Sequence, residues 1–408
     1  MSGNVATETA NELGRLGWIA LMLTPEMGPT RIGRAIQRLA VDSARGDVNE
    51  AMRPFSGAER VFTASLTELE AAGMPARAAQ FVADGRAHTA AEDEVKRVTE
   101  AGGFFVTRED EDYPERLLHI YDPPAVLWGR GNSKLLNRPG IAVVGTRHPS
   151  PYGAGMAEML ARDLANRRLT ILSGMARGID SAAHKGALEA GGKTVAVWGT
   201  GIDVVYPKEN KKLAEQIVAT GGAILSEYPL GTFPAPQNFP LRNRILSGMS
   251  VGVLVIEGGE YSGTRITARC AMEQNRDVYA VPGNVTNKNA WGPNTLIKQG
   301  ARLTATWEDI WEDLPRQVRL QLEDEMEAAG QGASKQGNAS LFEDDKPLPE
   351  HERLLLERLK RDETVQLDQL IEGMEGTLGS AEIFTALFEL EMAGRIKQMP
   401  GKNYVRCF

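Results

Sequence analysis

Short apolar runs alternate with amphipathic stretches through the middle of the chain. The first run, Ile141–Val144, is β-branched and fits a strand that is buried on both faces. It ends in the turn Gly145-Thr146-Arg147, and a helical pattern follows from about Tyr152. The runs that we expect to be strands are Ile141–Val144, Thr170–Leu172, Val195–Trp198, Ala223–Leu225, Val251–Ile256, Val278–Val281 and Arg302–Ala305. Because helical patterns separate them, they predict an α/β fold with a doubly wound, mostly parallel sheet.

The chain before this region has a purely helical pattern. Apolar residues recur near a spacing of 3.6 from Glu12, and Gly28-Pro29 starts a second helix. Further helices are expected at Ser65–Ala72, Pro75–Gly85 and Ala90–Ala101. Ser65 and Glu68 have the spacing of a capping box. The pattern predicts an all-α domain of the sterile-alpha-motif or helix-hairpin-helix kind, with a plain helical packing domain as an equal alternative, and disorder over residues 1–10.

The chain after the sheet region changes composition twice. Pro315–Pro349 is acidic and poor in large apolar residues, so we predict a linker. Three helical patterns and a hairpin then follow, which is the order of a winged-helix domain. The third helix carries Glu382, Glu389 and Glu391, which favours protein contact or a structural role over reading duplex DNA. The predicted domains are 1–100 (helical), 101–315 (sheet), 316–349 (linker) and 350–408 (winged-helix-like).

Charge and cysteine content narrow the class of protein. The formal net charge is −8, yet residues 141–315 hold 18 Lys and Arg against 16 Asp and Glu. The acidic excess therefore lies outside the sheet region and is no argument against an anionic ligand there. Two cysteines, Cys270 and Cys407, suit a reducing cytoplasm, and Cys270 fits a small core residue better than a nucleophile. No apolar run reaches about 18 residues, so we expect no membrane span and no secretion signal.

Polar, glycine-rich loops follow the expected strands directly. They are Gly145–Arg147, Ser173-Gly174, Gly199–Asp203, Ser226–Pro229, Glu257–Gly259 and Pro282-Gly283. In a parallel sheet such loops gather at the carboxyl edge, where open α/β folds bind ligands. Gly145 lets backbone N–H groups approach a ligand, and Arg147 adds a planar cation suited to phosphate. The pattern predicts an anion-binding edge.

The run Phe239–Arg244 opens a helix with two arginines. Positive charges in the first turn oppose the helix dipole, so Arg242 and Arg244 should each reduce the stability of the helix by about 0.3 kcal/mol or more. Either a carboxylate such as Glu227 or a bound phosphate would offset this cost. Phe239 fits a base-stacking residue and a core aromatic equally well on spacing alone. Three further cations, among them Lys211, follow Tyr206-Pro207 and fit a solvated face or phosphate contact.

The familiar nucleotide and metal motifs are absent from the sequence. Ala187–Thr194 has Ala where a P-loop needs Gly, and a strand follows it instead of preceding it. Gly199-Thr200-Gly201 lacks the third glycine of a dinucleotide fingerprint. No histidine stands at metal-ligand spacing. Asp180 and His184, one helical turn apart, are the best acid–base pair, although packing is favoured for His184. We therefore predict no catalytic residues, no cofactor and no metal.

The combined motifs resemble the DNA-processing protein A (DprA, or Smf) family. The motifs are Val144–Arg147, Ser173-Gly174 with Ala176 and Gly178–Asp180, Ala183-His184, Gly199 with Gly201–Asp203 and Tyr206-Pro207, Leu225–Pro229, Phe239-Pro240 with Arg242–Arg244, and Pro282-Gly283. They occur in family order and cover about residues 104–305. The helical first domain and the winged-helix-like last domain resemble the family's layout as well. One departure is Thr264-Arg265, where the family has an aliphatic residue before Ile266-Thr267-Ala268.

The resemblance implies an extended Rossmann-like domain that binds single-stranded DNA, forms a homodimer and loads RecA recombinase onto incoming DNA in natural transformation. The DNA contacts that it implies are Arg147, Ser173, Gly174, Lys211, Phe239, Arg242, Asn243 and Arg244. The alternative is a nucleoside-monophosphate hydrolase of the lysine-decarboxylase-like group. Those enzymes carry a Pro-Gly-Gly-x-Gly-Thr run with a following Glu, which Glu257–Thr264 matches only in part.

Overall fold

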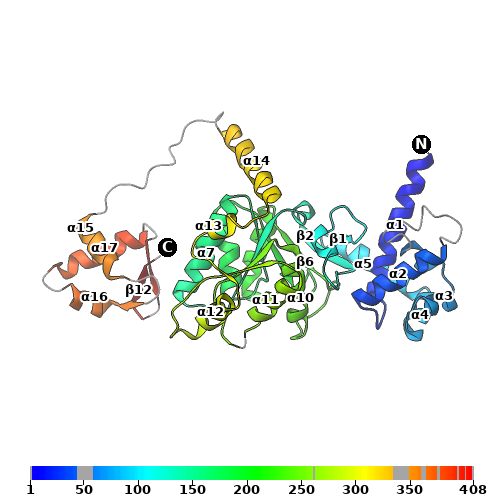
Figure 1. Ribbon diagram of the computed structural model, residues 1–408, viewed down its shortest axis with the longest axis horizontal. Coiled ribbons are helices and arrows are strands. Elements are labelled where there is room, and N and C mark those ends of the chain that lie inside the picture. Colours follow the sequence, from blue (N-terminus) through cyan, green and yellow to red (C-terminus); the bar gives the residue numbers. More distant parts are fainter. Residues whose placement is uncertain are drawn as a thin grey trace.

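A nine-stranded sheet forms the centre of the molecule (Figure 1). The structure is a computed structural model that describes residues 2–43, 58–260, 262–333, 349–359, 364–374, 377–392, 395–399 and 401–406. The strands are β1 (Gly103–Thr107), β2 (Val126–Gly131), β3 (Gly140–Val144), β4 (Thr170–Ser173), β5 (Thr194–Trp198), β6 (Ala223–Ser226), β7 (Gly252–Val255), β8 (Asp277–Ala280) and β9 (Arg302–Leu303). Their order in the sheet is β1-β2-β6-β5-β4-β3-β7-β8-β9.

The pairing of the strands confirms the predicted mostly parallel sheet. The strands from β6 to β9 in this order pair in parallel, whereas β1 pairs with β2 and β2 with β6 in antiparallel fashion. Strand order runs outward in both directions from β3, because β4 lies on one side of it and β7 on the other. This reversal is the switch point at which doubly wound sheets open a crevice for ligands.

Helices cover both faces of the sheet because side chains alternate between them. Ile141 and Val143 of β3 pack on one side, and Ala142 and Val144 on the other. The first side is covered by α7 (Pro151–Asn166), α8 (Ile179–Glu189), α13 (Glu308–Trp311) and α14 (Arg316–Ala333). The second is covered by α6 (Glu115–Leu118), α10 (Asn238–Met249), α11 (Thr264–Glu273) and α12 (Trp291–Lys298). A further helix, α9 (Lys211–Ala219), packs near β2, β5 and β6.

The N-terminal helices extend one end of this sheet, next to β1 and β2 (Figure 1). They are α1 (Ser2–Leu23), α2 (Pro29–Ser43), α3 (Leu66–Ala71), α4 (Ala76–Ala83) and α5 (Arg86–Glu100). Ser65 and Glu68 form the predicted capping box on α3. The expectation of disorder at the start of the chain is wrong, since α1 begins at Ser2.

The acidic stretch after the sheet is only partly a linker. Its first half is α14, and Val318 and Leu322 on this helix are buried against the sheet region. The expectation of a linker from residue 316 is therefore wrong for residues 316–333, where Val318 and Leu322, four positions apart on one face of the helix, pack into the core. Residues 334–348 lie outside the part that the structure describes.

The C-terminal region has its own core of buried leucine side chains. It consists of α15 (Glu350–Arg358), β10 (Val365–Gln366), α16 (Leu367–Gly373), α17 (Ser380–Met392), β11 (Ile396–Met399) and β12 (Asn403–Arg406). The strands form a three-stranded sheet in the order β10-β12-β11. The predicted winged-helix arrangement of three helices and a hairpin is thus confirmed. Among the helices described, none is long and apolar enough to span a bilayer.

Candidate functional site

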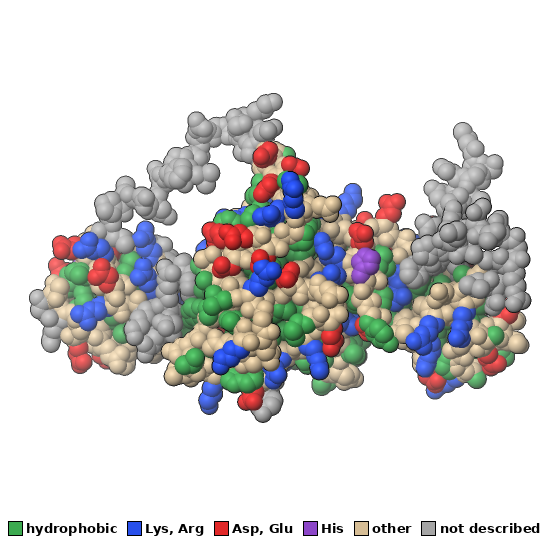
Figure 2. Space-filling model, in the orientation of Figure 1, with side chains coloured by type: hydrophobic (Ala, Val, Ile, Leu, Met, Phe, Trp, Pro, Cys, Tyr) green, Lys and Arg blue, Asp and Glu red, His purple; other side chains and the backbone are tan. Residues whose placement is uncertain are grey.

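The loops that follow the parallel strands surround one groove of about 650 Å³. Residues after β3, β4, β5 and β7 line it, together with the first turns of α10 and α11. The groove therefore lies at the carboxyl edge of the sheet, as the sequence pattern predicts. Acidic and basic side chains are interspersed over the face of the molecule that Figure 2 shows. The chemistry of the groove has to be derived from individual side chains.

A buried carboxylate holds the loop after β3 in place. Gly145 lies so close to Ile179 that a Cβ would come within 2.3 Å of its side chain. The Thr146 N–H donates to the Glu257 carbonyl at 2.8 Å. The Glu257 carboxylate is 1% exposed and accepts hydrogen bonds from the Ser150 N–H at 2.9 Å and the Ser150 hydroxyl at 2.5 Å. Ser150 in turn caps α7, so the loop that carries Arg147 is fixed at both ends.

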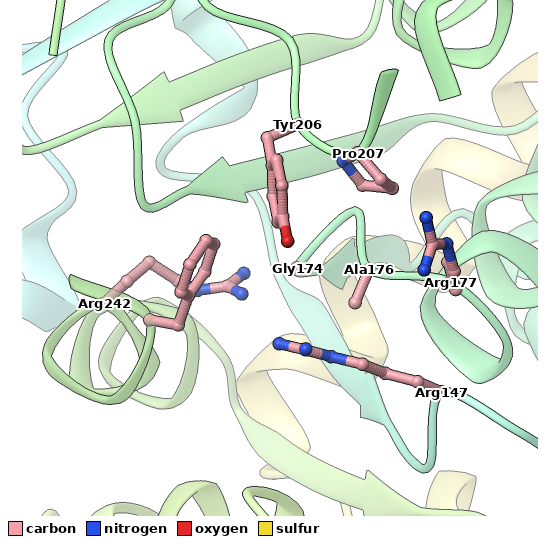
Figure 3. Close-up of a pocket in the computed structure, with 8 residues that line it drawn as sticks. Arg147, Gly174, Ala176, Arg177, Tyr206, Pro207 and Arg242 are labelled. Atoms are coloured by element: carbon pink, nitrogen blue, oxygen red, sulfur yellow. The ribbon is translucent and has the colours of Figure 1, made fainter. Parts of the chain in front are cut away.

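Two guanidinium groups and two aromatic rings face one another across the groove. The exposed Arg147 places its guanidinium carbon 5.9 Å from the ring centre of Phe239. Tyr206, which is 42% exposed, lies 5.4 Å from the same ring. Figure 3 shows Arg147 and Arg242 extending toward the same space, with the Tyr206 hydroxyl between them. Cations beside accessible rings are the combination that binds phosphates and stacks bases in single-stranded nucleic-acid sites.

Arg242 is buried beneath this space and only partly satisfied. It is 5% exposed, it donates to the Val197 carbonyl, and its Nε has no hydrogen-bond partner in the part of the protein that the structure describes. Burial lowers the pKa of Arg242, and the nearby Asp180 carboxylate raises it. A Cβ at Gly174 would come within 2.1 Å of this guanidinium, so the glycine lets the loop after β4 pass close to Arg242 without displacing it.

Asp180 supports the loop after β4 instead of serving as an acid or base. Its carboxylate accepts from the N–H groups of Gly174 and Ala176 at 3.1 and 3.2 Å. Burial raises its pKa, while Arg242 and these N–H groups lower it. His184 does not pair with Asp180. Its Nδ1 lies 2.6 Å from the Thr194 hydroxyl, and burial lowers the pKa of His184 to about 3. The packing role favoured for His184 is therefore confirmed, and no acid–base pair forms here.

The predicted contact residues fall into two groups. Arg147, Phe239, Arg242 and Asn243 line the groove, and Gly174 lines a small adjoining pocket that also contains Arg147, Phe239 and Arg242. The other three have other surroundings. The Ser173 hydroxyl is fully buried and donates to the Val143 carbonyl at 2.7 Å.

Arg244 and Lys211 lie outside the residues that line the groove. Arg244 donates to Glu227 at 2.6 Å and to Asp122 at 2.8 Å, and its side chain is 10% exposed. The sequence left open whether a carboxylate such as Glu227 or a bound phosphate offsets the charge of Arg244. In the structure the carboxylate of Glu227 does so. Lys211 begins α9 with a side chain that is 70% exposed, 4.0 Å from Glu215.

Sequence reasoning missed part of the groove. Its far wall is formed by Ser262, Thr264 and Ile266 at the start of α11 and by Asn289. Ile266 is 40% exposed although it is apolar. The signal was present, because Glu257–Gly259 is a strand-end loop that leads directly into this wall. Arg265, the departure from the family pattern, donates to the Glu260 carbonyl at 2.9 Å and lies 5.3 Å from the Trp291 ring.

The potential metal ligands lie elsewhere. Within the described residues, the one group of His, Cys, Asp and Glu with atoms close enough for a shared ion is His351, Glu352 and Glu389. It belongs to the C-terminal region, and two of the three are carboxylates, of which Glu389 is exposed. Exposed acidic groups of this kind are common without a metal, and the sheet-edge groove has no such group.

A doubly wound, mostly parallel sheet with a cationic, aromatic groove at its carboxyl edge defines a Rossmann-like protein that binds an anionic ligand. Comparison with known families narrows this class. Residues 104–315 match the family model described as DNA recombination-mediator protein A, and residues 343–402 match the DprA winged helix domain. The chain belongs to the DprA (Smf) family, which confirms the resemblance drawn from its motifs.

Individual relatives agree with this assignment. Protein Smf of Escherichia coli (strain K12) is 40% identical over 301 residues, which is 74% of this chain and 76% of the relative. DNA processing protein DprA of Bacillus subtilis (strain 168) is 44% identical over 206 residues, covering 50% and 69%. The X-ray structure of DNA processing protein A from Streptococcus pneumoniae superposes with a TM-score of 0.56 at 34% identity, over 69% of this chain and 93% of that one.

Proposed function

We propose that the protein binds single-stranded DNA in the sheet-edge groove and delivers it to RecA recombinase in the cytoplasm during natural transformation. The observation that carries the proposal is the convergence of Arg147 and Arg242 with the rings of Tyr206 and Phe239. Phosphates would lie against the two guanidinium groups, and bases would stack on the rings. Membership in a family described as recombination mediators supports the same function.

The geometry favours binding over catalysis. Asp180 and His184, the best acid–base candidates, are each engaged in holding the fold. Glu257, the carboxylate of the run that partly matches the lysine-decarboxylase-like hydrolases, is engaged by Ser150. We therefore propose a binding protein without catalytic activity, working as a homodimer. Light scattering of the purified chain checks the dimer, and RecA filament formation on protein-coated single-stranded DNA checks the delivery step.

The test of DNA binding is fluorescence anisotropy with a labelled oligo-dT at several salt concentrations. Each phosphate contact on a single strand contributes a slope of about −0.7 in log affinity against log salt. We expect steep salt dependence for the wild-type protein and a weaker, shallower response for Arg147→Ala combined with Lys211→Ala. Because Lys211 lies outside the groove lining, the Arg147 substitution should account for most of the loss.

Arg316→Ala is the control for the Arg147 substitution, since Arg316 is exposed on α14 and is not among the residues that line the groove. It removes one positive charge, as Arg147→Ala alone does, and should leave affinity unchanged. Salt-insensitive binding, or undiminished binding by the double variant, would rule out the proposal. Release of free base from nucleoside monophosphates by the purified protein would favour the hydrolase alternative instead.

A further inference from the structure

Three arginines form a stripe on the N-terminal helix α2. Arg31, Arg34 and Arg38 are spaced by three and four residues, so they share one face of the helix. All three are exposed. The opposite face buries Ile32 and Ile36 in the domain core. At 1.5 Å per residue, the stripe extends along about 10 Å of helix.

The stripe borders a separate groove of about 460 Å³. Its lining consists of the three arginines with Gly28, Pro29, Thr30, Ala72 and Gly73. This groove shares no lining residue with the groove at the sheet edge. Arg38 lies against the backbone at Gly73, where a Cβ would come within 2.7 Å of its guanidinium. The charged groups that line it are therefore all cationic.

The arginines are left without carboxylate partners in the described part of the protein. Arg31 donates to the backbone carbonyl of Glu26, whereas Arg34 and Arg38 have no hydrogen bond or ion pair there. The carboxylate of Glu26 faces Arg77 instead, at 3.7 Å. Like charges four residues apart destabilise a helix, and cations near its N-terminus oppose its dipole. A bound anion would remove both penalties.

We propose that this arginine groove is a second contact for the phosphate backbone of the DNA strand held at the sheet edge. The inference rests on the proposed function and extends it to the N-terminal domain. Guanidinium forks suit phosphates. The lining holds no aromatic ring for a base and no large apolar side chain, which protein interfaces place at their centre. The contact thus adds affinity without reading sequence.

The test compares two oligo-dT probes by fluorescence anisotropy. A short probe of about 8 nucleotides fills a single site of the usual size, whereas a probe of about 40 nucleotides can also reach the N-terminal domain. For Arg31→Ala/Arg34→Ala/Arg38→Ala in the full chain, we expect roughly tenfold weaker binding of the long probe and a salt slope smaller by about 2. Affinity for the short probe should not change.

Two variants distinguish a charge effect from a folding defect. Arg31→Lys/Arg34→Lys/Arg38→Lys keeps the charge and should keep most of the affinity for the long probe. The control Arg86→Ala/Arg269→Ala/Arg316→Ala removes three exposed arginines outside both grooves and should bind like the wild type.

Three outcomes would overturn the inference. The first is wild-type affinity of the triple alanine variant for the long probe while both proteins bind the short one. The second is loss of RecA filament formation with DNA affinity intact, which would make the groove a contact for an acidic protein. The third is failure of the wild-type chain to bind either probe, which would overturn the proposed function as well.

Discussion

The sheet-edge groove and the third helix of the winged-helix region both present aromatic rings to solvent, but with opposite charges around them. In the groove, Phe239 lies beside Arg147 and above the buried Arg242. On α17, Phe384 and Phe388 are 51% and 65% exposed, four residues apart on one face. Glu382, Glu389 and Glu391 lie on the same helix and are exposed as well.

The difference indicates that the charged residues near the exposed rings, and not the fold alone, decide which kind of ligand each region suits. Winged-helix domains often place their third helix against DNA, but carboxylates on this helix would repel phosphates. Two exposed rings on one helical face suit an apolar pocket on a protein. The hypothesis that this region contacts protein stays a prediction, and the exposed phenylalanine pair supports it. A fold shared with DNA-binding domains is an analogy until the side chains are considered.

Arg244→Ala should have the largest effect, on stability. The change leaves Glu227 buried and unpaired, which costs about 3–5 kcal/mol of the free energy of unfolding. Urea denaturation measures this loss. At low temperature the folded variant should bind oligo-dT with the wild-type salt slope. A reduced salt slope with an unchanged free energy of unfolding would instead identify Arg244 as a DNA contact and add a third arginine to the groove.

Phenylalanine substitutions compare the two regions directly. Phe239→Ala removes a stacking ring and should weaken oligo-dT binding by about 1–3 kcal/mol, or roughly 5- to 150-fold. Phe384→Ala combined with Phe388→Ala should change the same affinity by less than about twofold, because among the described residues no cation lies over these rings in the way Arg147 lies over Phe239. Anisotropy measures both. A large loss of oligo-dT affinity in the α17 variant would contradict the view that only the sheet-edge groove binds DNA.

The smallest expected effect is a dependence of protein stability on pH. It comes from Glu109, which belongs neither to the sheet-edge groove nor to α17. Burial raises the pKa of Glu109 to about 7; a hydrogen bond from Trp18 lowers it, and the charges of Glu59 and Asp110 raise it further. The folded protein thus keeps the proton over a pH range in which the unfolded chain has lost it. Stability is full below the ordinary pKa of 4.5 and falls as pH rises to about 7.

Glu109→Gln should remove this decline. The variant is expected to equal the wild type in urea denaturation near pH 4.5 and to exceed it modestly at pH 8, with unchanged oligo-dT affinity at both. Equal stability of the two proteins at pH 8 would contradict the raised pKa. A change in DNA affinity would show that the junction between the N-terminal helices and the sheet affects the groove.

The sheet could be predicted from sequence because its signals are local. Each strand from β3 to β8 is a run of buried apolar residues that ends in a glycine or a polar turn, and the predicted bounds agree within two residues. The loops after those strands then gather at one edge by topology alone. This is why Arg147, Gly174 and Phe239 could be expected together from positions far apart in the chain.

The rest depends on contacts that leave no local trace. Asp122 and Glu227 reach Arg244 from 122 and 17 residues away, so its burial could not be inferred from α10 alone. The acidic composition of residues 316–333 masked the two apolar positions that anchor α14. The wall at Ile266 was missed although the strand-end loop Glu257–Gly259 leads to it, because an exposed aliphatic residue in a helix has the same pattern as a buried one.

Glu257 has a consequence for kinetics. Its carboxylate and its carbonyl fix the loop between β3 and α7 within the folded protein. The loop therefore need not be ordered when a DNA strand arrives, and we expect that ordering of this loop does not slow association. Encounter is then limited by diffusion and charge, and the lifetime of the complex is set by how many phosphates and bases have to be released together.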